Sequence, residues 1–91
     1  MFTAKVIGNV VATQKDEKLV GSKLLVVSPL DKDLEETEEY HVAVDSVGAG
    51  TGETVLVTRG SAARRTQPYE ETPVDLAIVG IVDEIDISSQ G

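Results

Sequence analysis

The chain has 91 residues, no cysteine, and 16 acidic against eight basic residues, which gives a formal net charge of −8 at pH 7. This length fits one domain and leaves no room for a second core of comparable size. The lack of cysteine excludes disulfide frameworks, thiolate catalysis and Cys-ligated metal sites, and the negative charge repels nucleic-acid phosphates and anionic lipid surfaces. No secretory signal pattern follows Met1, so we expect a cytosolic protein with neither nucleic acid nor a membrane among its partners.

The first predicted strand covers residues 2–12, where the even positions read Phe, Ala, Val, Gly, Val and Ala and the odd positions carry most of the polar side chains. A period of two is typical of a strand with one face on a core. The polar run at residues 14–18 ends this strand. Residues 23–28 form a short apolar run stopped by Pro29, which predicts a second strand buried on both faces.

Residues 31–39 hold six carboxylates and one lysine. Carboxylate oxygens are calcium ligands, but the run lacks the central glycine and the Asp-x-Asp-x-Asp-Gly spacing of an EF-hand loop. Helix and loop are both compatible with this composition. We interpret the segment as an exposed, solvated loop and predict no metal site in it.

Three further strands are expected from β-branched, apolar runs at residues 40–44, 54–58 and 75–82. Between the last two, residues 61–65 suit one short helical turn with Ser61 as its N-cap. Five short strands without a sustained helical period predict an all-β protein, and we favour a five-stranded OB-like β-barrel. Residues 88–91 resemble a frayed tail.

The run Gly48-Ala-Gly-Thr-Gly52 is superficially similar to a phosphate-binding glycine loop. A Walker loop requires Lys and Ser or Thr after its last glycine, because the lysine neutralises the phosphates, but here Glu53 follows. A Rossmann fingerprint opens a helix, whereas this run opens an apparent strand. The run therefore predicts a loop in which backbones approach closely or adopt positive φ, and no nucleotide cofactor.

The only residues considered for a Ser–His–acid triad are His41, Asp45 and Ser61. No Gly-x-Ser-x-Gly nucleophile elbow surrounds the serine. We therefore predict no catalytic residue, and a lone histidine is poor support for a metal site. Arg64 is notable because basic residues are scarce. Its guanidinium could pair with a carboxylate inside a subunit or across an interface. The candidate carboxylates are Asp45, Glu53 and Asp75.

An ordered set of segments spans nearly the whole chain and closely resembles the EutN/CcmL family, the pentameric vertex proteins of carboxysomes and other bacterial microcompartments. No single segment is decisive, but the order is specific. The set comprises Gly8-Asn-Val-Val-Ala-Thr-Gln-Lys15, Leu19-Val-Gly-Ser-Lys-Leu-Leu-Val-Val27, Ala43-Val-Asp-Ser-Val-Gly-Ala-Gly-Thr-Gly-Glu53, Val55-Leu-Val57, Gly60-Ser-Ala-Ala-Arg64 and Pro73-Val-Asp-Leu-Ala-Ile-Val-Gly-Ile-Val-Asp83.

The resemblance implies a structural protein without catalytic activity, five copies of which cap the corners of a polyhedral shell. A flat layer of hexameric tiles cannot close, whereas a fivefold unit supplies curvature through heterologous contacts. The implied loop near the fivefold axis and its opening comprises Gly48, Ala49, Gly50, Thr51, Gly52 and Glu53. The expected subunit-interface residues are Asp45, Gly60, Ser61, Arg64 and Asp75.

The resemblance also implies the partners: further copies of the chain in a homopentamer, and hexameric or trimeric shell proteins around it. Residues 1–83 would form the vertex domain and residues 84–91 a short C-terminal tail. Asp45-Ser-Val and Ile78–Asp83 look closer to metabolosome members than to carboxysome ones. The alternative function is an OB-like binding module for single-stranded nucleic acid or a small ligand, which rests on fold class alone.

Overall fold

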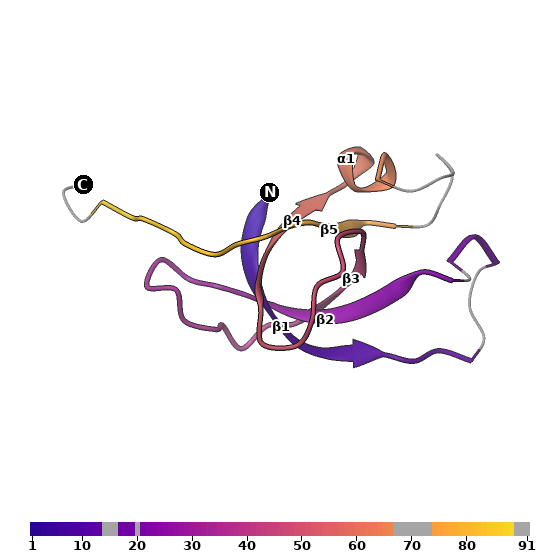
Figure 1. The fold of residues 1–91 in the computed structure, drawn as a ribbon, viewed down its shortest axis with the longest axis horizontal. Coiled ribbons are helices and arrows are strands. Elements are labelled where there is room, and N and C mark those ends of the chain that lie inside the picture. The colour runs from indigo at the N-terminus through magenta and orange to yellow at the C-terminus, as the bar shows by residue number, and fades with distance from the viewer. Residues whose placement is uncertain (14–16, 20, 67–73, 89–91) are drawn as a thin grey trace.

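The computed structural model describes residues 1–13, 17–19, 21–66 and 74–88. Its strands form one closed barrel in the order β1-β2-β3-β5-β4, with a short helix between the last two in sequence (Figure 1). The predicted five-stranded β-barrel is confirmed. The elements are β1 (Phe2–Val10), the 3-10 turn η1 (Glu17–Leu19), β2 (Lys23–Pro29), β3 (His41–Asp45), β4 (Thr54–Arg59), α1 (Ser61–Arg64) and β5 (Leu76–Ile81).

All neighbouring strands pair antiparallel except β3 and β5, which run parallel. This parallel pair closes the barrel. The register shifts between Val6 and Gly8 on β1, and again between Leu56 and Val57 on β4. Such irregularities bend strands and increase their twist, which a small closed barrel requires.

The barrel interior is filled by a single cluster of aliphatic side chains. Alternate positions of each strand supply it, because successive side chains of a strand point to opposite faces. On β1 the inward residues are Ala4 and Val6, as the period of two predicts. The other members are Leu25, Val27, Ala43, Ala49, Val55, Val57, Leu76 and Ile78.

A second, smaller cluster lies outside the barrel beneath α1. Ala63 of this helix is fully buried against Val44 of β3 and Ala77 of β5, with Val74 beside them. The short helix therefore covers the outer face of the parallel pair. Leu19 and Leu24 pack at the edge of this cluster.

Two sequence expectations differ from the structure in their details. β2 is not buried on both faces, since Leu24 and Val26 are half-buried on the outer side of the barrel wall. Ser61 is not the N-cap of the helical turn, because Gly60 occupies that position and no side chain caps the helix. Ser61 is instead the first helical residue, and the chain reverses one residue earlier, at a glycine with φ of 69°.

The acidic segment of residues 31–39 is an exposed loop, as expected. The Asp31 carboxylate accepts hydrogen bonds from the backbone N–H groups of Asp33 and Glu35, which folds the loop on itself. Residues 82–88 carry no regular secondary structure and lead away from the barrel (Figure 1). No helix in the part of the chain that the structure describes has the length and apolar character needed to cross a membrane.

Candidate functional site: the loop between β3 and β4

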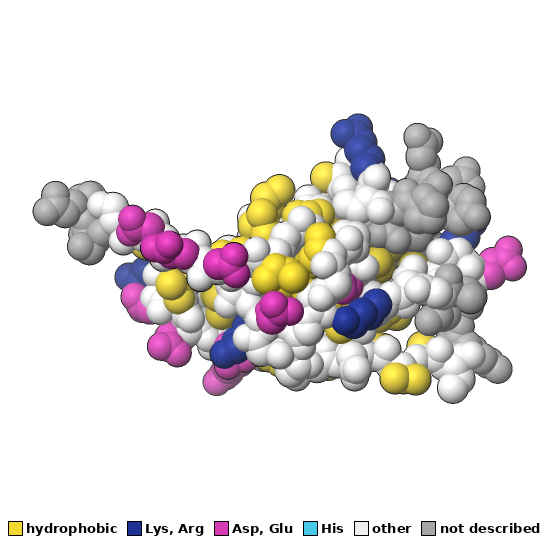
Figure 2. Space-filling model, in the orientation of Figure 1, with side chains coloured by type: hydrophobic (Ala, Val, Ile, Leu, Met, Phe, Trp, Pro, Cys, Tyr) yellow, Lys and Arg dark blue, Asp and Glu magenta, His cyan; other side chains and the backbone are white. Residues whose placement is uncertain are grey.

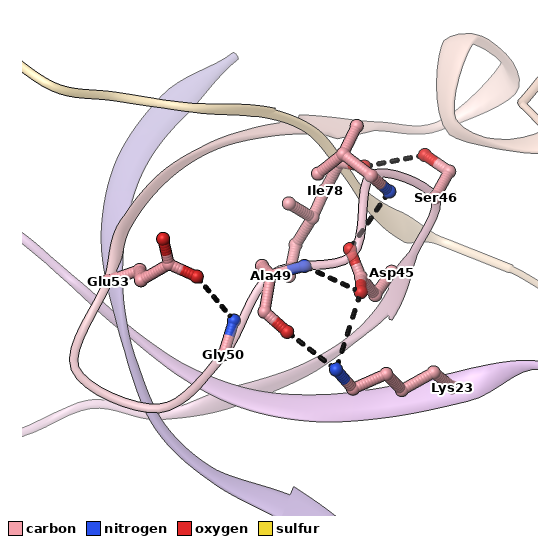
Figure 3. A network of polar contacts seen from close by, with 8 residues as sticks. Lys23, Asp45, Ser46, Ala49, Gly50, Glu53 and Ile78 are labelled. Atoms are coloured by element: carbon pink, nitrogen blue, oxygen red, sulfur yellow. Dashed lines mark hydrogen bonds and ion pairs between the residues drawn. The ribbon is translucent and has the colours of Figure 1, made fainter.

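The Asp45 carboxylate organises the start of the loop that joins β3 to β4. Its side chain is only 2% exposed. Oδ1 accepts a hydrogen bond from the Val47 N–H at 3.0 Å and Oδ2 accepts one from the Ala49 N–H at 2.9 Å (Figure 3). Hydrogen bonds to an ionised acceptor are stronger than neutral ones. Asp45 therefore acts as a local clamp on its own loop.

Lys23 joins this clamp from the neighbouring strand. The β2–β3 register places Lys23 opposite Asp45. Its Nζ donates a hydrogen bond of 2.6 Å to the Ala49 carbonyl and lies 3.8 Å from Asp45 Oδ2 (Figure 3). Ser46 adds a further tie, since its hydroxyl donates to the Ile78 carbonyl of β5 at 2.6 Å. The loop is thereby joined to both strands that flank β3.

Ala49 anchors the middle of the loop in the barrel core. Its side chain is fully buried and belongs to the interior cluster. The N–H of the next residue, Gly50, donates to Glu53 Oε1 at 2.7 Å. Thr51 and Gly52, by contrast, are exposed at the tip of the loop. The loop thus presents its tip outward while its centre is held from within.

Two of the three glycines here have positive φ, 80° at Gly48 and 93° at Gly52. This conformation favours glycine, as the sequence predicted. Gly50 is different, because its φ is not positive and a Cβ there would sit 3.5 Å from Glu53 Oε1, at ordinary contact distance. The Gly52 N–H donates to the Val6 carbonyl at 2.8 Å, which ties the tip to β1.

The second candidate segment is α1 with its flanks. Gly60 begins it with φ of 69° and ψ of −142°, and the Gly60 N–H donates to the Asp75 carbonyl at 2.9 Å. Ser61 and the Asp75 side chain are exposed, whereas Arg64 is half-buried. The structure gives Arg64 no ion pair with any described residue, so its pairing stays a prediction for the assembled state.

Replacing Gly60 with alanine is expected to destabilise the folded chain by about 1–3 kcal/mol. A Cβ at Gly60 would meet no atom within 4 Å, so the cost comes from backbone strain at positive φ and not from a steric clash. Urea unfolding monitored by circular dichroism measures it, with Gly8→Ala as the control because Gly8 has neither positive φ nor a neighbour within 4 Å of a Cβ. Equal unfolding midpoints for the two variants would contradict the assignment of backbone strain to position 60.

The structure brings part of the predicted set together. Asp45 and the loop of residues 48–53 form one connected network, and Gly60 meets Asp75 through the backbone. Among the described residues, no hydrogen bond or ion pair joins Ser61 or Arg64 to that loop. Sequence reasoning missed Lys23 and Ser46. Ser46 follows Asp45 directly, but Lys23 lies 26 residues from Ala49 and only the β2–β3 register reveals it.

The residues weighed for catalysis are not arranged for it. His41 and Asp45 lie at opposite ends of β3, about 13 Å apart along an extended strand. His41 Nε2 faces the Glu39 carboxylate at 3.7 Å, while the Asp45 carboxylate is taken up by its own loop. No group of His, Cys, Asp or Glu side chains among the described residues could hold a metal ion.

Comparison with known proteins identifies the chain's relatives. The family model described as "Ethanolamine utilisation protein EutN/carboxysome" matches residues 1–83. The chain belongs to the EutN/CcmL family. It is 46% identical over 90 residues to the carboxysome shell vertex protein CcmL of Synechococcus elongatus, covering 99% of this chain and 91% of that protein. It is 45% identical over 85 residues to the microcompartment shell vertex protein EutN of Salmonella typhimurium, covering 93% and 86%.

Solved structures agree with this membership in the EutN/CcmL family. The pentameric microcompartment shell protein GrpN of Rhodospirillum rubrum superposes with a TM-score of 0.89 at 46% identity, covering 97% of this chain and all of that one. CcmL of Gloeobacter violaceus superposes with a TM-score of 0.91 at 41% identity, covering 96% and 90%. The family consists of structural shell proteins, not enzymes, and its place is the shell of bacterial microcompartments in the cytoplasm.

Proposed function

We propose that this chain forms a homopentamer that caps the vertices of a polyhedral microcompartment shell. The observation that carries the proposal is the match of nearly the whole chain to shell vertex proteins at 40–48% identity, together with a superposition on a pentameric relative over 97% of the chain. This membership favours the shell function over the nucleic-acid alternative, against which the net charge of −8 also counts.

A closed ring of identical subunits is built from heterologous contacts, in which one surface of a copy meets a different surface of the next. Such contacts require apolar area outside the barrel core. Figure 2 shows hydrophobic side chains gathered over the middle of the molecule, where β4 and β5 run. Exposed apolar residues include Val47 of the β3–β4 loop and Ile81 of β5, at 40% and 39% exposure.

Within this ring, residues 48–53 would lie near the fivefold axis. The structure supports this because the loop is held rigidly from within, while Thr51 and Gly52 at its tip are exposed. Ala49 would contribute only backbone, since its side chain fills the core. The interface would include Gly60, Ser61, Arg64 and Asp75. Asp45 would act there through the loop it holds, because its carboxylate is turned inward.

Residues 1–83 would form the vertex domain and residues 84–91 the tail. The family match ends at residue 83, and Val82 is still tied to the barrel, since its N–H donates a hydrogen bond to the Thr54 carbonyl at 2.8 Å. Hexameric or trimeric shell proteins would surround the ring. Overall identity favours neither compartment type, since it is 46% with a carboxysome relative and 45% with EutN, so the metabolosome assignment stays a prediction.

The wild-type chain is expected to have a solution mass of about 48 kDa, five times the 9.7 kDa of one copy. Native mass spectrometry and light scattering at micromolar concentration measure it. Oligomerisation also stabilises a small domain by mass action, so the melting temperature should rise with protein concentration. A folded monomer or dimer with a concentration-independent melting temperature would overturn the proposal.

A further inference from the structure

The peptide unit between Ala49 and Gly50 is held at both of its ends. Its carbonyl accepts the Lys23 hydrogen bond of 2.6 Å, and its N–H donates to Glu53 Oε1 at 2.7 Å (Figure 3). Because a peptide unit is planar, fixing the carbonyl and the N–H fixes the orientation of the whole unit. The side chains of Lys23 and Glu53, which lie far apart in the sequence, therefore determine the orientation of this peptide unit.

Without these two contacts, this peptide unit could rotate at low cost. Rotation of the unit changes ψ of Ala49 and φ of Gly50, and glycine accepts positive and negative φ almost equally. The Asp45 carboxylate restrains only the N–H groups before this unit, those of Val47 and Ala49. Among the described residues, only Lys23 donates a hydrogen bond to the Ala49 carbonyl.

We infer that Lys23 is a positioning residue for ring assembly, which locks the Ala49–Gly50 peptide in the orientation that the loop presents to neighbouring copies. The role in assembly rests on the proposed function, whereas the hold on the loop rests on the geometry of the single chain. The hydrogen bond should contribute more than the ion pair. The contact with the Asp45 carboxylate spans 3.8 Å, and the lysine side chain is 52% exposed, where salt screens charge pairs.

The test compares Lys23→Met with Lys32→Met. Both variants remove one positive charge, but Lys32 lies in the exposed loop of residues 31–39. In Lys23→Met, amide hydrogen exchange over residues 46–53 should accelerate about tenfold, as expected for the loss of one charge-assisted hydrogen bond. The pentamer should also dissociate at a concentration about tenfold higher. Lys32→Met should behave as wild type, and Lys23→Arg, which keeps a donor, should restore part of the protection.

Two results would overturn the inference. One is unchanged exchange over residues 46–53 in Lys23→Met. The other is equal acceleration there and at the core amide of Ile78, which would mean that Lys23 only stabilises the barrel. If wild type itself is not pentameric, the proposed function fails, but the exchange comparison still decides whether Lys23 holds the loop. Raising salt to about 0.5 M should leave the wild-type protection largely intact, since the carbonyl contact is not a charge pair.

Discussion

Replacing Gly50 with valine is expected to break the ring while leaving the barrel folded. The folded monomer should tolerate the change, because Gly50 has no positive φ and its Cβ would meet only Glu53 Oε1 at 3.5 Å. The ring should not tolerate it, because the added methyl groups would project from a half-buried position in a loop that the proposal places where five copies converge. We expect association at least about 100-fold weaker, which corresponds to about 2.7 kcal/mol per ring contact.

Gly8→Val is the matched control for this variant. Gly8 lies on β1 and has no positive φ, and a Cβ there would meet no atom within 4 Å, so the same side chain is added on a strand without a clash. Analytical ultracentrifugation should find a pentamer for the control and a folded monomer for Gly50→Val, with circular dichroism confirming the barrel in both. A Gly50→Val pentamer of unchanged stability would refute the placement of this loop at the axis.

The strands could be predicted from sequence because their signals are local. Alternation along residues 2–12 and β-branched runs such as residues 54–58 indicate strands wherever they pair. The parallel pairing of β3 with β5 could not be predicted, nor could the register shift between β4 and β5, because both depend on residues distant in sequence. The burial of only one face of β2 likewise follows from closure of the barrel.

The candidate site also has features that local sequence predicts and features that depend on distant residues. The glycine run predicted close approach of backbones or positive φ, and the structure shows positive φ at Gly48 and Gly52 but not at Gly50. The inward turn of the Asp45 carboxylate also has a local origin, since aspartate commonly binds the N–H two residues on, here that of Val47. Sequence reasoning considered Asp45 as the acid of a triad, as a partner for Arg64 and as an interface residue, and overlooked this bond. The contact of Lys23 with the loop could not be predicted from the sequence, because only the β2–β3 register brings Lys23 close to the loop after β3.

Asp45→Ala is expected to have the largest effect on the stability of the single chain, about 3 kcal/mol. The substitution removes an almost fully buried carboxylate that accepts two backbone hydrogen bonds and faces Lys23. It leaves the Ala49 N–H without its partner, and an unsatisfied buried donor costs more than the net value of the bond it lost. The loop that carries Ala49 into the core should then become more mobile, and the pentamer should no longer form.

Asp33→Ala provides the control, because it removes the same charge from an exposed loop. Melting at matched protein concentration should show a fall of more than about 10 °C for Asp45→Ala and little change for Asp33→Ala. Asp45→Asn keeps the shape of the side chain but removes one of its two acceptor oxygens. An amide has one acceptor oxygen, so it can serve only one of the Val47 and Ala49 N–H groups well, and its stability should fall between wild type and Asp45→Ala. If Asp45→Asn matched wild type, the carboxylate would not be the clamp that holds this loop.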